Sequence, residues 1–251
     1  HAVQLYGVLL PGAGPQDRPC VVMELAAGTL RDLIHHSSTI PRPQLLAVVL
    51  PLLAQLAMAL WYMHERGVAH CDVKPANVFV VLTAAGLARI KIGDFGLTRV
   101  AADEGDGAVL EPRGTPAYCC GGGGGRGATI VGQLPPPLPL QPPGHVRVPP
   151  STAVACELFH EPPLPATAAA LAAVDVCALG RVINEAATGA VPWEGADGPV
   201  VEYNVRDGVL PPGLFDDDGD EIPEGMEDRE LRGALRALVG RCCGSNPAER
   251  G

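Results

Sequence analysis

Apolar residues along this chain of 251 residues fall into short runs bounded by Gly and Pro and into longer runs with helical spacing. The short runs predict strands at 2–10, 20–25, 79–82 and 87–92. The last two are separated only by 83–86, which indicates a hairpin. The longer runs predict helices at 45–63, around 175–180 in an Ala-rich stretch, and at 231–243. The pattern therefore predicts strands mainly in the first half of the chain and helices mainly after them.

The predicted helix at 45–63 is apolar throughout except for Gln55 and is long enough to cross a bilayer. Pro51 lies near its start, Gln55 lies in its middle, and a polar motif begins only seven residues beyond its end. These features favour a buried helix of a globular domain over a transmembrane span. We therefore expect no membrane contact from this segment.

The composition favours a globular protein and argues against several kinds of partner and metal site. A hydrophobic content of 47% is ample for a core, and a net charge of -10 argues against nucleic acid or an anionic membrane as a partner. The eight Cys show no Cys-x-x-Cys pair, so neither a zinc site nor a disulfide framework is expected. Reduced thiols and the lack of a visible secretory signal favour a cytoplasmic or nuclear location. The chain starts at His1 instead of Met, so a full-length protein tethered to a membrane outside this segment stays open.

Two polar motifs bracket the predicted hairpin. The first is His-Cys-Asp-Val-Lys-Pro-Ala-Asn at 70–77, and the second is Gly-Asp-Phe-Gly at 93–96. Each motif alone is a weak signal, and a hairpin flanked by solvated acids is the ordinary alternative. Their joint order and spacing resemble the catalytic loop and the metal-binding loop of eukaryotic protein kinases.

The resemblance implies a role for each polar side chain of these motifs. Asp72 would accept the proton of the substrate hydroxyl, while Asn77 and Asp94 would hold Mg²⁺. Lys74 would contact the transferred phosphate, as in serine/threonine kinases, since tyrosine kinases usually lack this lysine. Thr115, in the Arg-Gly-Thr-Pro-Ala-Tyr segment at 113–118, would bridge Asp72 and Lys74. The implied activity is transfer of the ATP γ-phosphate to a protein hydroxyl, with ATP and Mg²⁺ as cofactors.

The same resemblance implies an α+β, protein-kinase-like fold. Residues 1–25 would be the last strands of the N-terminal lobe with the entry to the hinge, and 26–251 would be the helical C-terminal lobe. Four residues would then form the nucleotide site: Met23 as gatekeeper, the backbone of Glu24 and Ala26 as partners of adenine, and Phe79 as the floor under the ring. Both assignments have an ordinary alternative. From residue type alone, Phe79 is a core residue, and an apolar strand followed by Gly is a common transition from a strand to a helix.

Four residues are expected to support the site. The resemblance implies a structural role for His70 and makes Asp175 an anchor of the catalytic-loop backbone. Asp175 lies among Ala, Leu and Val, where a carboxylate is costly to bury without hydrogen bonds. Glu157 would form an ion pair with Arg250, although a surface Arg at a frayed end is an equal alternative.

An insertion at 120–154 interrupts the expected substrate-docking loop. It contains five consecutive Gly at 121–125 and a proline-rich tract at 135–150. Gly runs favour a flexible coil and Pro runs favour polyproline II, so we expect a disordered insert. A docking site for an SH3- or WW-type partner is the alternative, although the flanking Arg that such ligands usually have is missing.

The chain departs from the kinase pattern in two ways. No Gly-rich loop is present, and its two lysines, Lys74 and Lys91, both fall in the C-terminal lobe. Either the chain is a fragment that is inactive in isolation, or the protein is a pseudokinase scaffold or interaction module; the complete catalytic set favours the fragment. Cys71 stands where the family most often has Arg, so the clamp for a phosphorylated loop cannot form. We expect activity that is not switched by phosphorylation between 98 and 115.

Overall fold

The computed structural model describes residues 1–10, 18–36, 40–103, 114–119, 166–206 and 229–243. Its strands are β1 (Leu5–Leu9), β2 (Cys20–Met23), β3 (Gly28–Thr29), β4 (Val68–Ala69), β5 (Val78–Leu82), β6 (Ala88–Ile92) and β7 (Arg99–Val100). Its helices are α1 (Leu30–His35), α2 (Arg42–His64), α3 (Ala166–Thr188), α4 (Gly198–Arg206) and α5 (Arg229–Cys242), with 3-10 turns η1 (Pro75–Asn77), η2 (Phe95–Leu97), η3 (Ala101–Asp103) and η4 (Pro116–Tyr118). This mixture of small sheets and helices confirms the α+β class.

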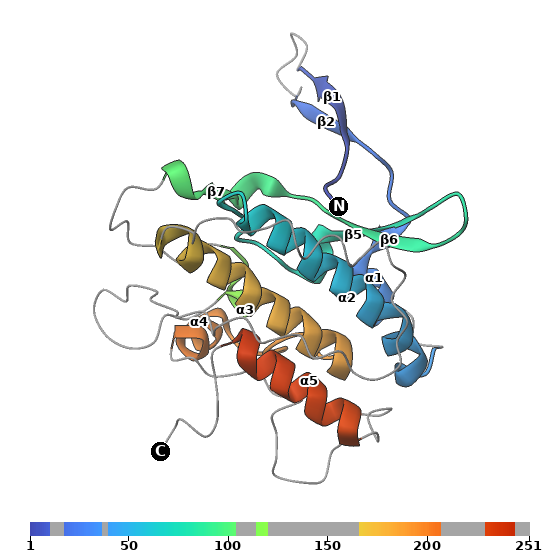
Figure 1. The fold of residues 1–251 in the computed structure, drawn as a ribbon, viewed down its shortest axis with the longest axis vertical. Coiled ribbons are helices and arrows are strands. Elements are labelled where there is room, and N and C mark those ends of the chain that lie inside the picture. The colour runs from blue at the N-terminus through green and yellow to red at the C-terminus, as the bar shows by residue number, and fades with distance from the viewer. Residues whose placement is uncertain (11–17, 37–39, 104–113, 120–165, 207–228, 244–251) are drawn as a thin grey trace, which may run out of the picture.

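The described strands form three small sheets. β1 and β2 make an antiparallel hairpin, β5 pairs with both β3 and β6, and β4 pairs with β7. The hairpin of β1 and β2 projects away from the helical body in Figure 1, and the side chains of both strands are exposed. β5 and β6 form the hairpin that the sequence predicts, with Val78 opposite Ile92 and Leu82 opposite Ala88.

A capping box joins β3 to the first helix. The Thr29 hydroxyl accepts a hydrogen bond from the Asp32 amide at 3.2 Å, and the Asp32 carboxylate accepts one from the Thr29 amide at 2.8 Å. Without these bonds, the backbone amides of Thr29 and Asp32 would be unsatisfied donors at the start of the helix. Leu30, the first residue of α1, is fully buried. The chain therefore turns from strand to helix at a defined residue.

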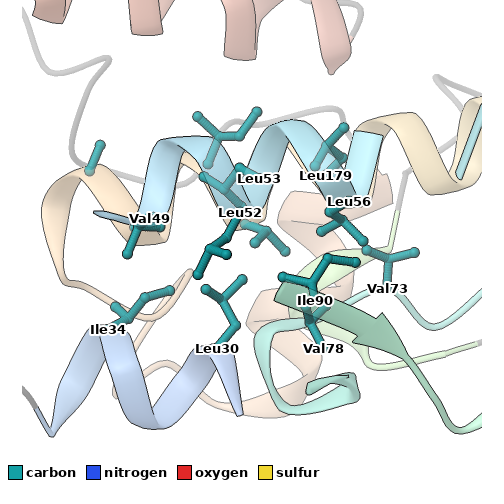
Figure 2. Close-up of a cluster of buried hydrophobic side chains, with 14 of the residues drawn as sticks. Leu30, Ile34, Val49, Leu52, Leu53, Leu56, Val73, Val78, Ile90 and Leu179 are labelled. Carbon is teal, nitrogen blue, oxygen red and sulfur yellow. The ribbon is translucent and has the colours of Figure 1, made fainter. Parts of the chain in front are cut away.

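The main hydrophobic core lies between α2 and the elements α1, α3, β5 and β6. Figure 2 shows its apolar side chains converging from α1, α2, α3 and the β5–β6 hairpin. The labelled residues are Leu30, Ile34, Val49, Leu52, Leu53, Leu56, Val73, Val78, Ile90 and Leu179. Burying a Leu or Ile side chain contributes roughly 1.5–3 kcal/mol, so this cluster is the main source of stability in the described part of the chain.

Helix α2 is, within the described ranges, the helix long and apolar enough to cross a membrane. Length and composition do not distinguish such a span from a core helix. One face of α2 is buried against α3 and β6, and Pro51 lies within the helix on the exposed side. Gln55 uses its side-chain oxygen to accept a hydrogen bond from the Ile90 amide at 3.1 Å. This packing agrees with the expected core helix.

Helices α3 and α5 approach each other closely at Gly180. A Cβ atom at this position would lie 2.7 Å from the Cβ of Cys242 and 3.0 Å from the Sγ of Cys243. Such distances are shorter than normal van der Waals contact, so only Gly permits this helix separation. Figure 1 shows α2, α3 and α5 as neighbouring helices of the body.

Candidate active site

The His70–Asn77 loop leads from β4 into β5, and Asp175 of α3 holds its first residues. The Asp175 carboxylate accepts hydrogen bonds from the backbone amides of His70 at 2.7 Å and Cys71 at 2.8 Å. It also accepts one from the His64 ring at 2.9 Å, and it is fully buried. A buried carboxylate needs such donors. Asp175 therefore has the hydrogen-bond donors that its apolar surroundings in the sequence require.

His70 links this loop to the one that carries Asp94. Its Nε2 donates to the carbonyl oxygen of Gly93 at 3.0 Å, while its Nδ1 accepts from the Asp72 amide at 3.3 Å. One donor and one acceptor nitrogen describe a neutral imidazole with the proton on Nε2. The ring also packs against Phe95, with centroids 5.2 Å apart. His70 therefore holds the two motifs in a fixed relation.

Two unusual backbone conformations bring a third segment to the loop. Cys71 has a positive φ of 64°, which is costly for a residue with a side chain. Gly114 has φ 106°, and a Cβ there would lie 2.5 Å from the carbonyl oxygen of Cys71. Glycine at 114 therefore lets the segment 114–119 lie directly on the loop.

Asp72 is the centre of the site. Its Oδ1 accepts hydrogen bonds from the amide of Thr115 at 2.9 Å and from the Thr115 hydroxyl at 2.8 Å. Its Oδ2 accepts from Lys74 Nζ at 2.7 Å and from Asn77 Nδ2 at 2.9 Å. Burial raises the pKa of Asp72, but the hydrogen bonds from Lys74 and Thr115 and the charge of Lys74 outweigh it and hold the pKa below its usual value. The carboxylate is therefore ionised at neutral pH.

Lys74 and Thr115 complete a closed group with Asp72. Lys74 Nζ donates to the Thr115 hydroxyl at 2.8 Å in addition to its bond with Asp72. The two residues come from segments that are 41 positions apart in the sequence. The structure thus contains the bridge from Thr115 to Asp72 and Lys74 that the resemblance implies.

Asn77 and Asp94 carry side-chain oxygens on two loops that meet where the Gly93 amide donates to the Asn77 carbonyl oxygen at 3.0 Å. Asn77 uses its side-chain nitrogen to donate to the Asp72 backbone carbonyl at 2.9 Å as well as to the carboxylate. This orientation leaves its Oδ1 as an acceptor. Asp94 follows Gly93, has φ 63° and is exposed, with its Oδ1 next to Gly96. The site therefore has one amide oxygen and one carboxylate suited to a hard cation.

The expected nucleotide residues lie where β2 ends and β5 begins. Met23 is the last residue of β2, and its side chain is exposed, whereas Ala26 is partly buried. The Phe79 ring packs on Gly93, where a Cβ would lie only 2.5 Å from it. Phe79 therefore joins the segment after β2 to the Asp94 loop, as a floor residue requires; its contact with adenine stays a prediction.

Glu24 has a side-chain partner that sequence reasoning missed. Its carboxylate lies 2.6 Å from Nζ of Lys91 on β6 and accepts a hydrogen bond from the Gln4 amide at 2.7 Å. The hydrogen bond from Lys91, followed by that from Gln4, lowers the pKa of Glu24. Lys91 lies opposite Phe79 in the β5–β6 ladder, on the same face. In the sequence, the position of Lys91 three residues before Asp94 could have indicated that its side chain lies near the candidate site.

A second buried carboxylate was also missed. Glu185 of α3 accepts a hydrogen bond from the Tyr118 hydroxyl at 2.5 Å and lies 2.7 Å from Nε2 of His35 on α1. Burial, followed by the nearby Glu185 charge, raises the pKa of Tyr118. An acidic residue within an apolar helix needs a hydrogen-bond partner. The sequence could have indicated a partner for Glu185 by this argument, as it did for Asp175.

Several predictions lie outside the described residues. These are the ion pair of Glu157 with Arg250, the insertion at 120–154 and the acidic interval 104–113. Within the described part, Cys20, Cys71, Cys119, Cys242 and Cys243 carry thiol side chains, as expected.

Comparison with known proteins identifies the family. Residues 1–121 match the family described as protein kinase domain. The chain is 29% identical over 241 residues to the serine/threonine-protein kinase PknB of Mycobacterium tuberculosis, covering 95% of this chain and 29% of that protein. It is 40% identical over 92 residues to PknB of Mycobacterium leprae, which is 36% of this chain and 13% of that protein. It is also 39% identical over 120 residues to CBL-interacting protein kinase 4 of Oryza sativa subsp. japonica, which is 47% of this chain and 24% of that protein.

The comparisons support a protein kinase catalytic domain of the serine/threonine type. The chain spans less than a third of the length of the curated relatives it matches. The matched residues 1–121 include both polar motifs and Thr115. Protein kinases in general use ATP and a divalent metal ion.

The kinase domain has donors that fit Mg²⁺. This ion prefers an octahedral oxygen shell and is usually held by one or two protein side chains together with substrate phosphates and water. Asn77 and Asp94 supply such a pair. Within the described residues no group of three or more His, Cys, Asp or Glu side chains forms an alternative metal site. The residues present thus fit a magnesium ion bound jointly with a nucleotide.

Proposed function

We propose that this protein transfers the γ-phosphate of ATP to a Ser or Thr hydroxyl of a protein substrate. The observation that carries the proposal is the set of four hydrogen bonds around Asp72, donated by Thr115, Lys74 and Asn77. This arrangement fixes an ionised carboxylate beside an ammonium group. Positioning and electrostatic stabilisation are the main contributions of a protein to phosphoryl transfer.

Asp72 would orient the acceptor hydroxyl and take its proton. Its lowered pKa makes it a weak base in the ground state, which suits a loose transition state in which the phosphoryl group carries most of the charge. Lys74 Nζ already lies 2.7 Å from Asp72 and would neutralise charge on the transferred group. Thr115 would keep both side chains in position through its hydroxyl.

ATP and Mg²⁺ would bind next to this group. Asn77 and Asp94 would hold the ion, which would supply positive charge to offset the negative charge of the phosphates. The backbone of Glu24 and Ala26 would contact adenine beside Met23, over Phe79. The short path from Phe79 to Gly93 supports this assignment because it places the proposed adenine floor next to the Asp94 loop.

A pseudokinase scaffold is the second candidate. Lys74 and Lys91 are the two lysines of the sequence, and their ammonium groups pair with Asp72 and Glu24. Neither is therefore free to grip the α- and β-phosphates. An interaction role of the proline-rich tract at 135–150 also stays a prediction, as does a cytoplasmic location.

Substitution of Asp72 in the full-length protein tests the proposed reaction. We expect Asp72→Asn to lower the rate of phosphate transfer from ATP to a generic protein substrate by roughly 10²–10⁴-fold, because the proton acceptor is lost. Asp94→Ala should abolish metal-dependent turnover. The measurement is incorporation of labelled phosphate under saturating Mg-ATP.

Glu194→Gln is the matched control, because Glu194 is an exposed acid outside the site. It should leave the rate unchanged. Wild-type rates in both Asp72→Asn and Asp94→Ala would refute the proposed reaction. A wild-type protein that binds Mg-ATP without turnover would instead support the scaffold.

A further inference from the structure

Arg181 is a buried cation in helix α3 for which the sequence suggested no role. Its side chain is only 2% exposed, within a helix made largely of Ala, Leu and Val. Taking a guanidinium group out of water is costly unless hydrogen bonds or opposite charges replace the solvent. An arginine at such a position therefore needs partners, and these partners indicate its purpose.

In the described part of the chain, Arg181 donates hydrogen bonds to the backbone of the segment that contains Ala117 and Cys119. Its guanidinium donates to the carbonyl oxygen of Cys119 and, at 3.4 Å, to that of Ala117. It also lies over the Trp193 ring, with its Cζ 4.9 Å from the ring centroid. Among the described residues, no Asp or Glu forms an ion pair with it, and its Nε has no hydrogen-bond partner. The backbone carbonyls are thus its main recognised partners.

The segment 115–119 is held at two further points. Thr115 bonds to Asp72 and Lys74, and the Tyr118 hydroxyl bonds to Glu185. Glu185 lies four residues after Arg181, so both project from one face of α3. One basic and one acidic side chain of the same helix therefore hold the same segment, the first through carbonyl oxygens and the second through a hydroxyl.

We propose that Arg181 is a positioning residue for protein-substrate binding, which fixes the segment 115–119 so that Thr115 stays against Asp72 and Lys74. The proposal rests on the proposed kinase function, because that function makes this segment the surface next to the acceptor. A planar guanidinium can bond two carbonyl oxygens at once, whereas a lysine ammonium is a compact point charge on a flexible stem. The identity of the residue therefore matters as well as its charge.

Thiol labelling tests the positioning role without any need for catalysis. Cys119 is only 8% exposed, and burial raises the pKa of its thiol, so the wild-type protein should react slowly with N-ethylmaleimide. In Arg181→Met we expect Cys119 to react about tenfold faster, because the segment opens more often once its carbonyls lose their donor. Arg181→Lys should give an intermediate rate. Mass spectrometry of the digested protein measures each cysteine separately.

Two matched controls make the labelling decisive. Cys242 is partly buried where α5 packs on α3 at Gly180, and burial raises the pKa of its thiol, so it reports opening of the helical body away from segment 115–119. Arg89→Met removes an exposed arginine and should change neither rate. Selective acceleration at Cys119 supports the proposal. No acceleration, or equal acceleration of Cys242 and Cys119, would overturn it, because equal acceleration marks a general loss of stability.

Kinetics of the full-length protein provide a second readout. Arg181→Met should raise KM for a protein substrate about tenfold and leave KM for ATP unchanged, since the segment contacts the acceptor side of the site. Arg181→Lys should restore part of the loss. An equal effect on both KM values would contradict a positioning role. If the wild type transfers no phosphate, the proposed function fails, whereas the labelling result still decides whether Arg181 holds the segment.

Discussion

Asp175, Glu185 and Asp72 are three buried carboxylates whose different donors give them different tasks. Asp175 bonds to backbone amides and a histidine, which makes it an anchor. Glu185 bonds to Tyr118 and His35 and joins two elements. Asp72 bonds to an ammonium, an amide side chain and a threonine, so its negative charge stays available to a reactant. The donors of each carboxylate therefore determine whether it supports the fold or faces the reaction.

The lowered pKa of Asp72 predicts a pH-dependent contribution to stability. A carboxylate whose pKa is lower in the folded protein stabilises the fold above its unfolded value of 3.8, and this contribution is lost as pH falls through the folded pKa. Asp72→Asn has no such contribution. We therefore expect the difference in free energy of unfolding between wild type and Asp72→Asn to shrink as pH falls from 7 to below 3.8.

Urea unfolding of both proteins across this range measures the difference. Glu194→Gln serves as the control, since an exposed acid should give a small and constant difference. A gap between wild type and Asp72→Asn that stays constant with pH would contradict the assigned ionisation of Asp72.

Sequence reasoning pointed to the residues that the kinase resemblance covers, including Asp175 and Thr115 with their distant partners, and it missed Arg181. Asp72, Lys74, Asn77 and Asp94 are recognisable because their spacing is short and their chemistry is joint. Arg181 donates to carbonyls more than 60 positions away, and backbone carbonyls leave no trace in residue type. A buried charge in an apolar helix can be noticed in the sequence, but its partner requires the fold.

At the scale of elements, α3 is the support of the site. Asp175 holds the catalytic loop, Arg181 and Glu185 hold the segment 115–119, and the opposite contact with α5 depends on Gly180. α2 supplies the core beneath them (Figure 2). Helices α2, α3 and α5 and the β5–β6 hairpin could be predicted because their apolar runs are long or regularly spaced, whereas the apolar pattern missed the shorter α1 and α4. The 3-10 turns and the short β3, β4 and β7 could not, because tertiary hydrogen bonds define them.

Gly180 gives a prediction about the packing of α3 on α5. In Gly180→Ala the new Cβ would lie 2.7 Å from the Cβ of Cys242, so the helices must separate. We expect a loss of about 1–3 kcal/mol in the free energy of unfolding, as for other overpacked cores. Denaturant unfolding of the variant measures it.

Gly233→Ala is the matched control within α5. A Cβ at this position meets no atom within 4 Å, so the substitution should stabilise the helix by about 1 kcal/mol through backbone entropy. Opposite signs for the two variants are therefore expected. Equal stability of Gly180→Ala and Gly233→Ala would show that the α3–α5 contact tolerates a methyl group.

At the scale of the whole molecule, the candidate site residues lie together on the described elements. The Asp72 group, Asn77, Asp94 and Phe79 lie on one body, while the hairpin of β1 and β2 projects from it with apolar side chains exposed (Figure 1). Both lysines are already paired. Lys74 and Lys91 are the two lysines of the sequence.

We therefore expect the isolated 251-residue chain to bind Mg-ATP weakly, with a Kd of about 1 mM or weaker, because few groups remain to contact the phosphates. Isothermal titration calorimetry measures this affinity. Asp94→Ala should remove the remaining metal-dependent binding, whereas Lys91→Met should leave it unchanged, since Lys91 is paired with Glu24. Micromolar affinity that Lys91→Met abolishes would contradict this, because Lys91 would then leave Glu24 and grip the phosphates. That outcome would also turn the isolated domain from a partial site into a complete one, with its phosphate-binding lysine on β6.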